Sequence, residues 1–307
     1  MTDVPVLILA YNRPYQVRRL LAALRSVRPR KIYLSIDGPA NEATAVLGRQ
    51  CAAALDEIDW ECQVAVQRLG NNHGGSVGPS RGISWMFSRE EFGIIFDDDI
   101  DPRPEFFEYV AHCRDEFRHD ARVGAISGNN FTNARYDFWG GKCGLSRYFF
   151  GWGWATWRER WNAFNLNADS LEAFVRSPDA IKSMVYGDVR VAEIWQRIYE
   201  RWRTGGAWDF MWQIHLWKHG LETLIPPVNL TGNVGIGADS TNIQTELMFM
   251  ADWRASWLHP LPANWRQGAV KSMVGDQFNN TIRNDGVPES RLFMQTQDQA
   301  RSLFEIR

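Results

Sequence analysis

Residues 93–117 read GIIFDDDIDPRPEFFEYVAHCRDEF. The stretch begins with a short apolar run, 93–96, which is typical of a buried strand. A cluster of acids and a proline-containing turn follow, and then apolar side chains recur at the spacing of a helix, at Phe106, Val110, Cys113 and Phe117. A strand, a polar loop and a helix in this order form the repeating unit of an α/β protein.

The same unit occurs three times before this stretch. We expect strands at residues 4–10, 31–36 and 62–66, each followed by a polar loop and a helical pattern. Residues 123–127 add a further apolar run. Because strands that alternate with helices predict a parallel, doubly wound sheet, the expected fold is α/β and Rossmann-like, with a mostly parallel sheet flanked by helices.

The composition is that of a globular protein with nearly balanced charge. The chain has 307 residues, of which 45% are hydrophobic and 23% charged, and its formal net charge is −2. Nucleic-acid binders are usually basic, so we expect no nucleic-acid partner. The 15 tryptophans exceed what one core needs. Since Trp rings stack well on sugar rings, they suggest carbohydrate chemistry.

No segment predicts secretion or membrane insertion. Residues 4–10 are too short for a signal peptide, and no apolar run reaches the length of a membrane span. The four cysteines lack C-x-x-C spacing, so we expect buried thiols and a cytoplasmic location. A basic run could touch the inner face of a membrane, although a solvated helix face is the simpler explanation. Its members are Arg18, Arg19, Arg25, Arg28, Arg30 and Lys31.

Three adjacent acids, Asp97, Asp98 and Asp99, stand directly after the apolar run. Side chains alternate along an extended chain, so Asp97 and Asp99 face one way and Asp98 the other. Carboxylates crowded at the end of a buried strand need a cation, and oxygen ligands favour Mg²⁺ or Mn²⁺. The alternative is a solvated acidic turn before the helix, to which we assign Asp101.

Ligands in such folds bind at the carboxyl ends of the strands, so further polar residues should join the acids there. The expected members are Ala10, Tyr11, Asn12 and Arg13 after the first strand, Asp37 after the second, and His73 and Arg81 in the glycine-rich loop 70–82. Arg13 could pair with a phosphate or a base, and Asp37 could accept a hydrogen bond from a base N–H. A surface arginine and a turn-capping aspartate are the alternatives. The loop opens a helix, whose N-terminus suits anions.

One acid, Asp209, lies among aromatic residues in the stretch 208–212 (WDFMW). Apolar surroundings raise the pKa of a carboxyl group, which makes it a better general base. An acid in the first turn of a helix, favoured by the helix dipole, is the alternative. Trp152, Trp154 and Trp208 are candidates for stacking on a sugar, with core packing as the alternative.

Together these segments resemble those of GT-A glycosyltransferases, and in particular the N-acetylglucosaminyltransferase I family and bacterial nucleotide-diphospho-sugar transferases. The resemblance covers roughly residues 4–245 and rests on VPVLILAYNRP, SIDG, FDDDIDPRPEFFEYV, FFGWGWATW and AWDFMW, in that order. Two positions depart from the family pattern. Asp97 stands where the family often has Glu, and Phe210 stands where its W-D-D-W segment has a second acid.

The resemblance implies a role for each residue. Asp99 would be the main metal ligand, assisted by Asp97, while Asp97 and Asp98 would hold the ribose, the nucleotide or metal-bound waters. Arg13 and Asp37 would contact uridine, and Asp209 would be the general base.

The implied activity is that of a metal-dependent, inverting hexosyl- or N-acetylhexosaminyltransferase that needs Mn²⁺ or Mg²⁺. It would move a sugar from a UDP-sugar, with UDP-N-acetylglucosamine as one candidate, to a hydroxyl of a glycan or lipid-linked acceptor, as in polysaccharide biosynthesis. A retaining transferase on the same fold and a carbohydrate-binding protein with a degenerate site remain as alternatives.

The implied organisation is a single domain over residues 1–260 and a C-terminal extension over 261–307. Within the domain, 1–135 would be the nucleotide-binding half and 136–260 a Trp-rich acceptor-side half. We expect the loop 226–242, rich in Pro, Gly and Asn, to act as a lid over the site.

Overall fold

The computed structural model describes residues 1–129, 142–166, 169–185, 187–203, 208–235, 265–266 and 269–271. Within them, one large sheet has the strand order β11-β7-β9-β6-β8-β4-β1-β2-β3. Its strands are β1 (Val6–Ala10), β2 (Lys31–Ile36), β3 (Gln63–Arg68), β4 (Phe92–Asp97), β6 (Val123–Ser127), β7 (Cys143–Ser146), β8 (Trp154–Trp157), β9 (Glu222–Ile225) and β11 (Ala269–Lys271). A second, two-stranded sheet pairs β5 (Ile100–Pro102) with β10 (Thr231–Asn233).

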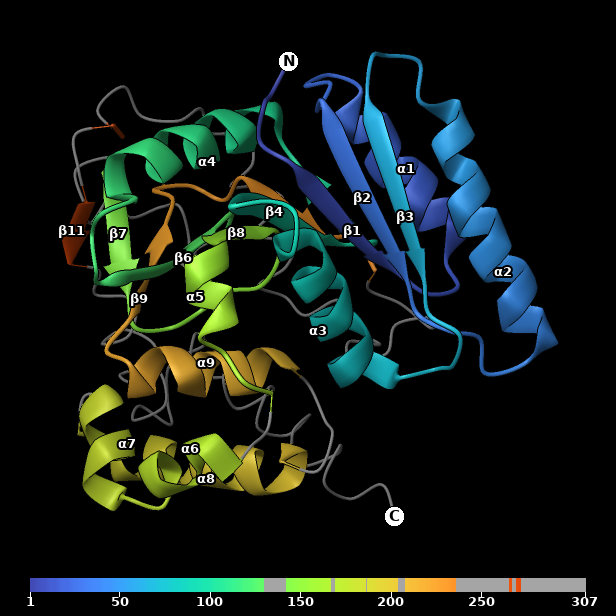
Figure 1. Cartoon of the computed structure of the whole chain (residues 1–307). Coiled ribbons are helices and arrows are strands. Elements are labelled where there is room, and N and C mark those ends of the chain that lie inside the picture. Colours follow the sequence, from blue (N-terminus) through green and yellow to red (C-terminus); the bar gives the residue numbers. More distant parts are fainter. Residues whose placement is uncertain are drawn as a thin grey trace, which may run out of the picture.

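The predicted fold class is confirmed, because the sheet is mostly parallel and helices flank both of its faces (Figure 1). β3, β2, β1 and β4 run parallel, whereas β8 runs antiparallel between β4 and β6. β1 is buried at every residue, as expected of a central strand covered on both faces. The carboxyl ends of β1, β2 and β4 therefore meet at one edge.

The helices are α1 (Pro14–Leu24), α2 (Glu42–Ala53) with the 3₁₀ turn Ala54–Glu57, α3 (Gly74–Phe87), α4 (Pro104–Phe117), α5 (Arg158–Asn162), α6 (Asp169–Val175), α7 (Pro178–Met184), α8 (Val189–Trp202) and α9 (Trp208–Lys218). Pro14 and Pro104 begin α1 and α4, where the missing N–H would have no helical partner in any case. α1 thus starts immediately after Arg13, and α4 starts five residues after Asp99.

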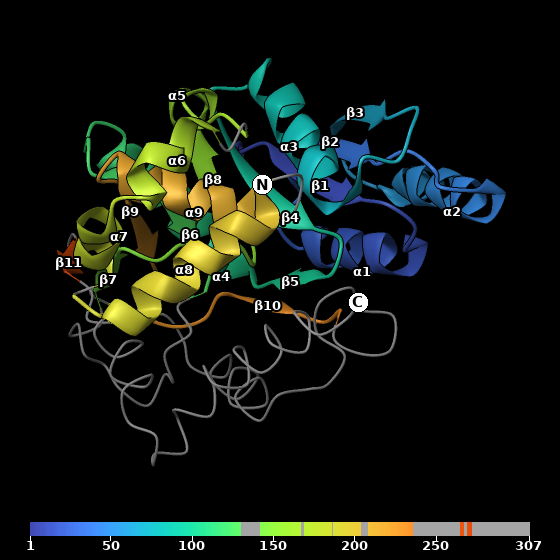
Figure 2. The ribbon, with the colours of Figure 1, turned by 90° about the horizontal axis from the view of Figure 1, so that it is seen from below.

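Three apolar clusters hold the layers together. One packs α1, α2 and α4 on a face of the sheet, and a second packs α3, α5 and α9 on the other face (Figure 2). The third joins α6, α7 and α8 to the outer side of α9, away from the sheet. As a result, α9 is buried on both sides and its N-terminus is held firmly near the sheet.

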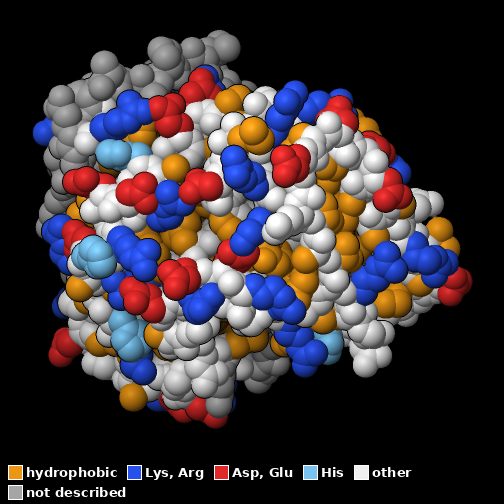
Figure 3. Space-filling model, turned by 45° about the horizontal axis from the view of Figure 1, so that its top comes forward, with side chains coloured by type: hydrophobic (Ala, Val, Ile, Leu, Met, Phe, Trp, Pro, Cys, Tyr) orange, Lys and Arg blue, Asp and Glu red, His pale blue; other side chains and the backbone are white. Residues whose placement is uncertain are grey.

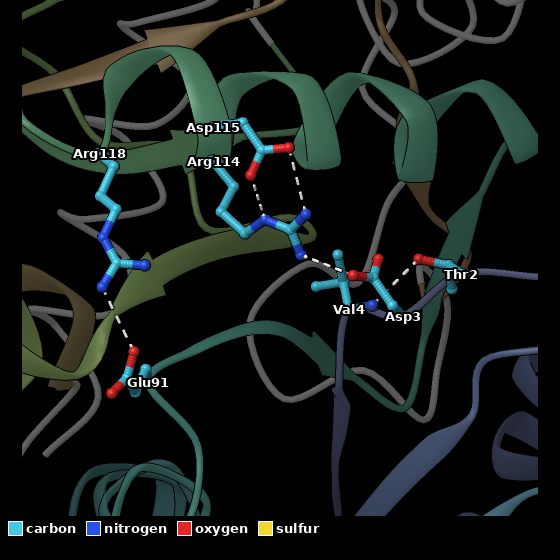
Figure 4. Close-up of polar contacts among 7 residues, drawn as sticks. All are labelled: Thr2, Asp3, Val4, Glu91, Arg114, Asp115 and Arg118. Atoms are coloured by element: carbon cyan, nitrogen blue, oxygen red, sulfur yellow. Dashed lines mark hydrogen bonds and ion pairs between the residues drawn. The ribbon is translucent and has the colours of Figure 1, made fainter.

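Polar contacts fix α4 along its solvent side (Figure 4). Arg114 pairs with Asp115 at 2.7 Å and with Asp3 at 3.2 Å, while Arg118 reaches Glu91 at 3.4 Å. These contacts tie the helix to the beginning of the chain and to the turn before β4.

Acidic and basic side chains are interspersed on the face shown in Figure 3. Four of the six members of the basic run form ion pairs, Arg18 with Glu57, Arg19 with Asp101, Arg25 with Asp59 and Lys31 with Glu90. Such ion pairs are expected of basic residues on a solvated surface, the simpler of the two explanations for the basic run. No helix in the described part of the chain is both long and apolar enough to span a membrane.

Two short strands lie in segments where the sequence predicted none. Thr231–Asn233, inside the expected loop 226–242, forms β10, and residues 236–242 lie outside the described residues. Ala269–Lys271, inside the expected C-terminal extension, forms β11 and pairs with β7 of the main sheet. Both strands are only three residues long, so neither leaves a periodic pattern in the sequence.

Candidate functional site

The ends of β1 and β2 are locked together at the carboxyl edge of the sheet. Ala10 is the last residue of β1, and its carbonyl accepts a hydrogen bond from the backbone N–H of Asp37 at 3.0 Å. Tyr11 and Asn12 follow it and are half-buried. Arg13 comes next and begins α1 as its N-cap residue. The expected residues of the first two strands are thus brought to one place.

Arg13 lies directly on two of the three acids. Its Nη1 donates to Asp99 Oδ2 at 3.0 Å, and its Nε donates to Asp98 Oδ2 at 3.3 Å. Its Nη2 also pairs with Asp98 Oδ1. Burial raises the pKa of Asp98 to about 7, although the Arg13 charge opposes that rise. Burial lowers the pKa of Arg13, but Asp98 and Asp99 together raise it by more. The net pKa is therefore above the ordinary value, and the guanidinium stays charged.

The third acid, Asp97, has a different electrostatic environment. Its pKa is raised well above the ordinary value by burial, then by Asp99 and Asp98, and also by Asp209. Trp208, the residue before Asp209, stacks on Trp154 of β8, and Trp154 pairs with Ile95 of β4, so the first turn of α9 packs beside the end of β4. Within the described residues, no arginine or lysine pairs directly with Asp97.

Asp209 itself sits at the start of α9 with a raised pKa. Burial is the main cause, while hydrogen bonds from the backbone N–H groups of Phe210 and of Asp209 itself act in the opposite direction. The Phe210 N–H donates to Asp209 Oδ1 at 3.0 Å. A half-buried acid with a raised pKa has a property expected of a general base.

Asn233 is a member of the site that sequence reasoning missed. Its Nδ2 donates to Asp99 Oδ1 at 3.3 Å, and its Oδ1 accepts from the Gly235 backbone N–H at 2.7 Å. The Val234 N–H donates to the Asp99 carbonyl at 2.9 Å. A Cβ atom on Gly235 would collide with the Asp99 carboxylate. The pairing of β10 with β5 brings Asn233 here, and no motif in the sequence signals it.

Asp37 holds the glycine-rich loop in place. Its carboxylate accepts backbone hydrogen bonds from Gly38 at 2.9 Å, His73 at 3.1 Å and Gly74 at 2.9 Å. These contacts are those of an aspartate that caps a turn, the alternative to contact with a base. At the other side of the loop, His73 Nε2 lies 3.3 Å from Arg81 Nη1, so these two expected residues also meet.

The three candidate tryptophans have different environments. Trp154 and Trp208 are only 1% and 6% exposed, and their rings stack on each other with centroids 5.5 Å apart. Both rings thus pack in the core, which was the alternative to stacking on a sugar. Trp152 is half-buried, and its carbonyl accepts a hydrogen bond from Thr231. Of the three, Trp152 alone retains an exposed surface that a sugar could contact.

The acids suit a hard cation that is shared with a substrate. In the described part of the chain, no three His, Cys, Asp or Glu side chains converge as a complete protein metal site. Mg²⁺ is commonly held by one or two carboxylates together with substrate phosphates. Asp97 and Asp99 provide carboxylate oxygens of the required kind, so the residues fit such a shared ion.

No protein-family model matches the sequence, and no curated protein matches it. Among solved structures, the chain is similar to the apo structure of the WbbM bifunctional glycosyltransferase, with 10% sequence identity and a TM-score of 0.39. The match covers 85% of this chain and 45% of that one, so this chain spans less than half the length of the protein it matches. The function is therefore argued from the site.

Proposed function

We propose that the protein is a glycosyltransferase of the GT-A type, which transfers a sugar from a UDP-sugar to a hydroxyl group with the help of Mn²⁺ or Mg²⁺. The observation that carries the proposal is the packing of the first turn of α9, which holds Asp209, against β8 beside the end of β4, which holds Asp97. Asp97 ends a central strand beside two further acids, and Asp209 is a half-buried acid with a raised pKa. Carboxylates for a metal and a carboxylate for a proton thus lie on elements that pack side by side.

The residues of the first half of the chain would bind the donor. The N-terminus of α3, shaped by Asp37 and flanked by His73 and Arg81, offers backbone N–H groups and a positive charge to an anion. Arg13 adds a guanidinium fork, whose geometry matches carboxylates and phosphates. The bound metal would neutralise the charge of the departing diphosphate.

In the proposed reaction, Asp209 accepts the proton of the acceptor hydroxyl as the hydroxyl oxygen bonds to the anomeric carbon. The bond between that carbon and the diphosphate oxygen breaks, and its electron pair leaves with the nucleoside diphosphate. Attack from the face opposite the diphosphate inverts the anomeric centre. Asp209 lies on α9, which packs beside α3 on one face of the sheet.

The test is a screen of UDP-, GDP- and dTDP-sugars for thermal stabilisation and donor hydrolysis, with Mn²⁺ and with EDTA. We expect a UDP-sugar to raise the Tm only when Mn²⁺ is present. Asp97→Asn should abolish this response. Asp101→Asn is the matched control, because Asp101 pairs with Arg19 at 2.9 Å and lies in β5, so its loss leaves the proposed metal ligands in place.

The other outcomes separate the alternatives. A nucleotide affinity in EDTA equal to that in Mn²⁺ would contradict the proposed dependence on a metal ion. Sugar binding without hydrolysis of any donor would favour a carbohydrate-binding protein. A product that retains the donor's anomeric configuration, read by NMR, would replace the inverting mechanism with a retaining one.

A further inference from the structure

Arg13 pairs with two of the three acids through all three nitrogens of its guanidinium group. Its three guanidinium nitrogens contact both oxygens of Asp98 and Oδ2 of Asp99. Asp98 is 3% exposed, so this contact supplies its counter-charge out of reach of solvent ions. Arg13 itself is 29% exposed, which leaves its head group next to the open side of the site.

A divalent ion bound at Asp99 would meet this guanidinium. Asp99 Oδ1 is hydrogen-bonded to Asn233, and Oδ2 is the oxygen that Arg13 holds. Two cations at one carboxylate oxygen repel each other strongly where burial lowers the effective dielectric constant. The metal and the Arg13 contact with Asp99 therefore exclude each other.

We propose that Arg13 is the resident counter-ion of the acidic cluster and that a divalent metal binds there by displacing Arg13 from Asp99. This inference rests on the proposed metal site. A diphosphate gives the released guanidinium a new anionic partner of matching geometry. Metal and nucleotide are then coupled through Arg13, so the metal binds weakly alone and tightly once the diphosphate is present.

The decisive variant removes the ion pair as a unit. Arg13→Gln combined with Asp98→Asn deletes one positive and one negative charge, so the local net charge is unchanged and Asp98 is not left as a buried charge without a partner. Asp99 loses the guanidinium but keeps its hydrogen bond from Asn233. Asp97 and Asp99 keep their carboxylates. Arg19→Gln is the matched control, since Arg19 is on the same helix and pairs with Asp101, two residues beyond Asp99.

Mn²⁺ affinity is measured without nucleotide, from the EPR signal of free Mn²⁺. We expect the double variant to bind Mn²⁺ roughly 5–150-fold more tightly than the wild type, the usual range of coupling between sites. Arg19→Gln should match the wild type within about twofold, because its charge does not compete for Asp99. Arg13→Lys has one ammonium group in place of the fork, so it should give an intermediate affinity and keeps the test open if the double variant does not fold.

Two failures are distinguishable. If the wild type binds no Mn²⁺ even with UDP, the metal in the proposed function is overturned, and this inference with it. If the wild type binds Mn²⁺ with UDP but neither the double variant nor Arg13→Lys binds it more tightly than the wild type without nucleotide, the coupling through Arg13 alone is overturned.

Discussion

Asp37 joins two loops through a single carboxylate. Because its oxygens accept three backbone hydrogen bonds, Asp37→Ala leaves the N-H groups of Gly38, His73 and Gly74 without that partner. We expect a loss of about 1–3 kcal/mol in the free energy of unfolding, measured with urea. Asp59→Ala is the control, since Asp59 is 61% exposed in its pair with Arg25 and its loss should cost less than about 1 kcal/mol.

The same variant, Asp37→Ala, tests contact with the base. Its affinity for UDP should fall more than its affinity for pyrophosphate if Asp37 also contacts the base. An equal fall in the two affinities would contradict that role.

Asp209 separates chemistry from binding. General-base assistance is worth about 10²–10⁴ in rate, so Asp209→Asn should lower turnover by about that factor. The Mn²⁺-dependent affinity for UDP should stay nearly unchanged, because Asp209 lies on α9 and not in the nucleotide-binding loops. Variants of Asp99 should lose both properties. Near-normal turnover of Asp209→Asn with the true acceptor would mean that another group is the base.

At the scale of the element, α9 carries both a candidate base and a buried histidine. His215 stacks on Trp212 with ring centroids 5.3 Å apart, and it is 2% exposed. Its Nε2 has no hydrogen-bond partner in the described part of the chain. Burial is the main reason that the pKa of His215 is lowered to about 4, with smaller effects of His219 and Lys218. The folded protein therefore needs this ring to be neutral.

The stability of α9 should consequently depend on pH. The unfolded chain protonates His215 near pH 6.5 and the folded chain only near pH 4, so stability is present above pH 6.5 and is lost as the pH falls between these values. At pH 5.5 the loss should be about 1 kcal/mol relative to pH 7.5. His215→Phe should remove this part of the pH dependence in urea unfolding, whereas replacement of the exposed His119 by Gln should leave it in place. An unchanged pH dependence in His215→Phe would assign it to other groups.

At the scale of the whole molecule, Trp265 and β11, late in the sequence, pack with the main sheet and its core. Trp265 is 4% exposed, lies against Tyr109 and His112 of α4, and accepts a hydrogen bond from the Cys143 thiol through its carbonyl at 3.4 Å. β11 then pairs with β7. Trp265 is thus part of the core that packs against α4, and β11 extends the main sheet.

Trp265→Ala should therefore destabilise the whole domain. Loss of a buried tryptophan typically costs about 3–5 kcal/mol. The neighbouring Arg266→Ala is the control, because Arg266 lies over the Trp265 ring and pairs with Glu108 at the surface, which is worth about 1 kcal/mol or less. A single cooperative transition shifted to lower urea is expected for Trp265→Ala. Equal midpoints for the two variants would show that the segment is an appendage.

The alternation of strands and helices over the first 127 residues follows from local patterns, because hydrophobic periodicity and proline positions act within one element. The edge of the sheet that gathers Arg13, Asp37 and the acids follows from the same patterns, since parallel strands end together. Side-chain partners were decided by the tertiary structure alone. Arg13 meets Asp98 across 85 positions and Asn233 meets Asp99 across 134. Burial of Trp154 against Trp208 likewise depends on how α9 packs on the sheet, because exposure is a property of the neighbours that long-range folding brings together.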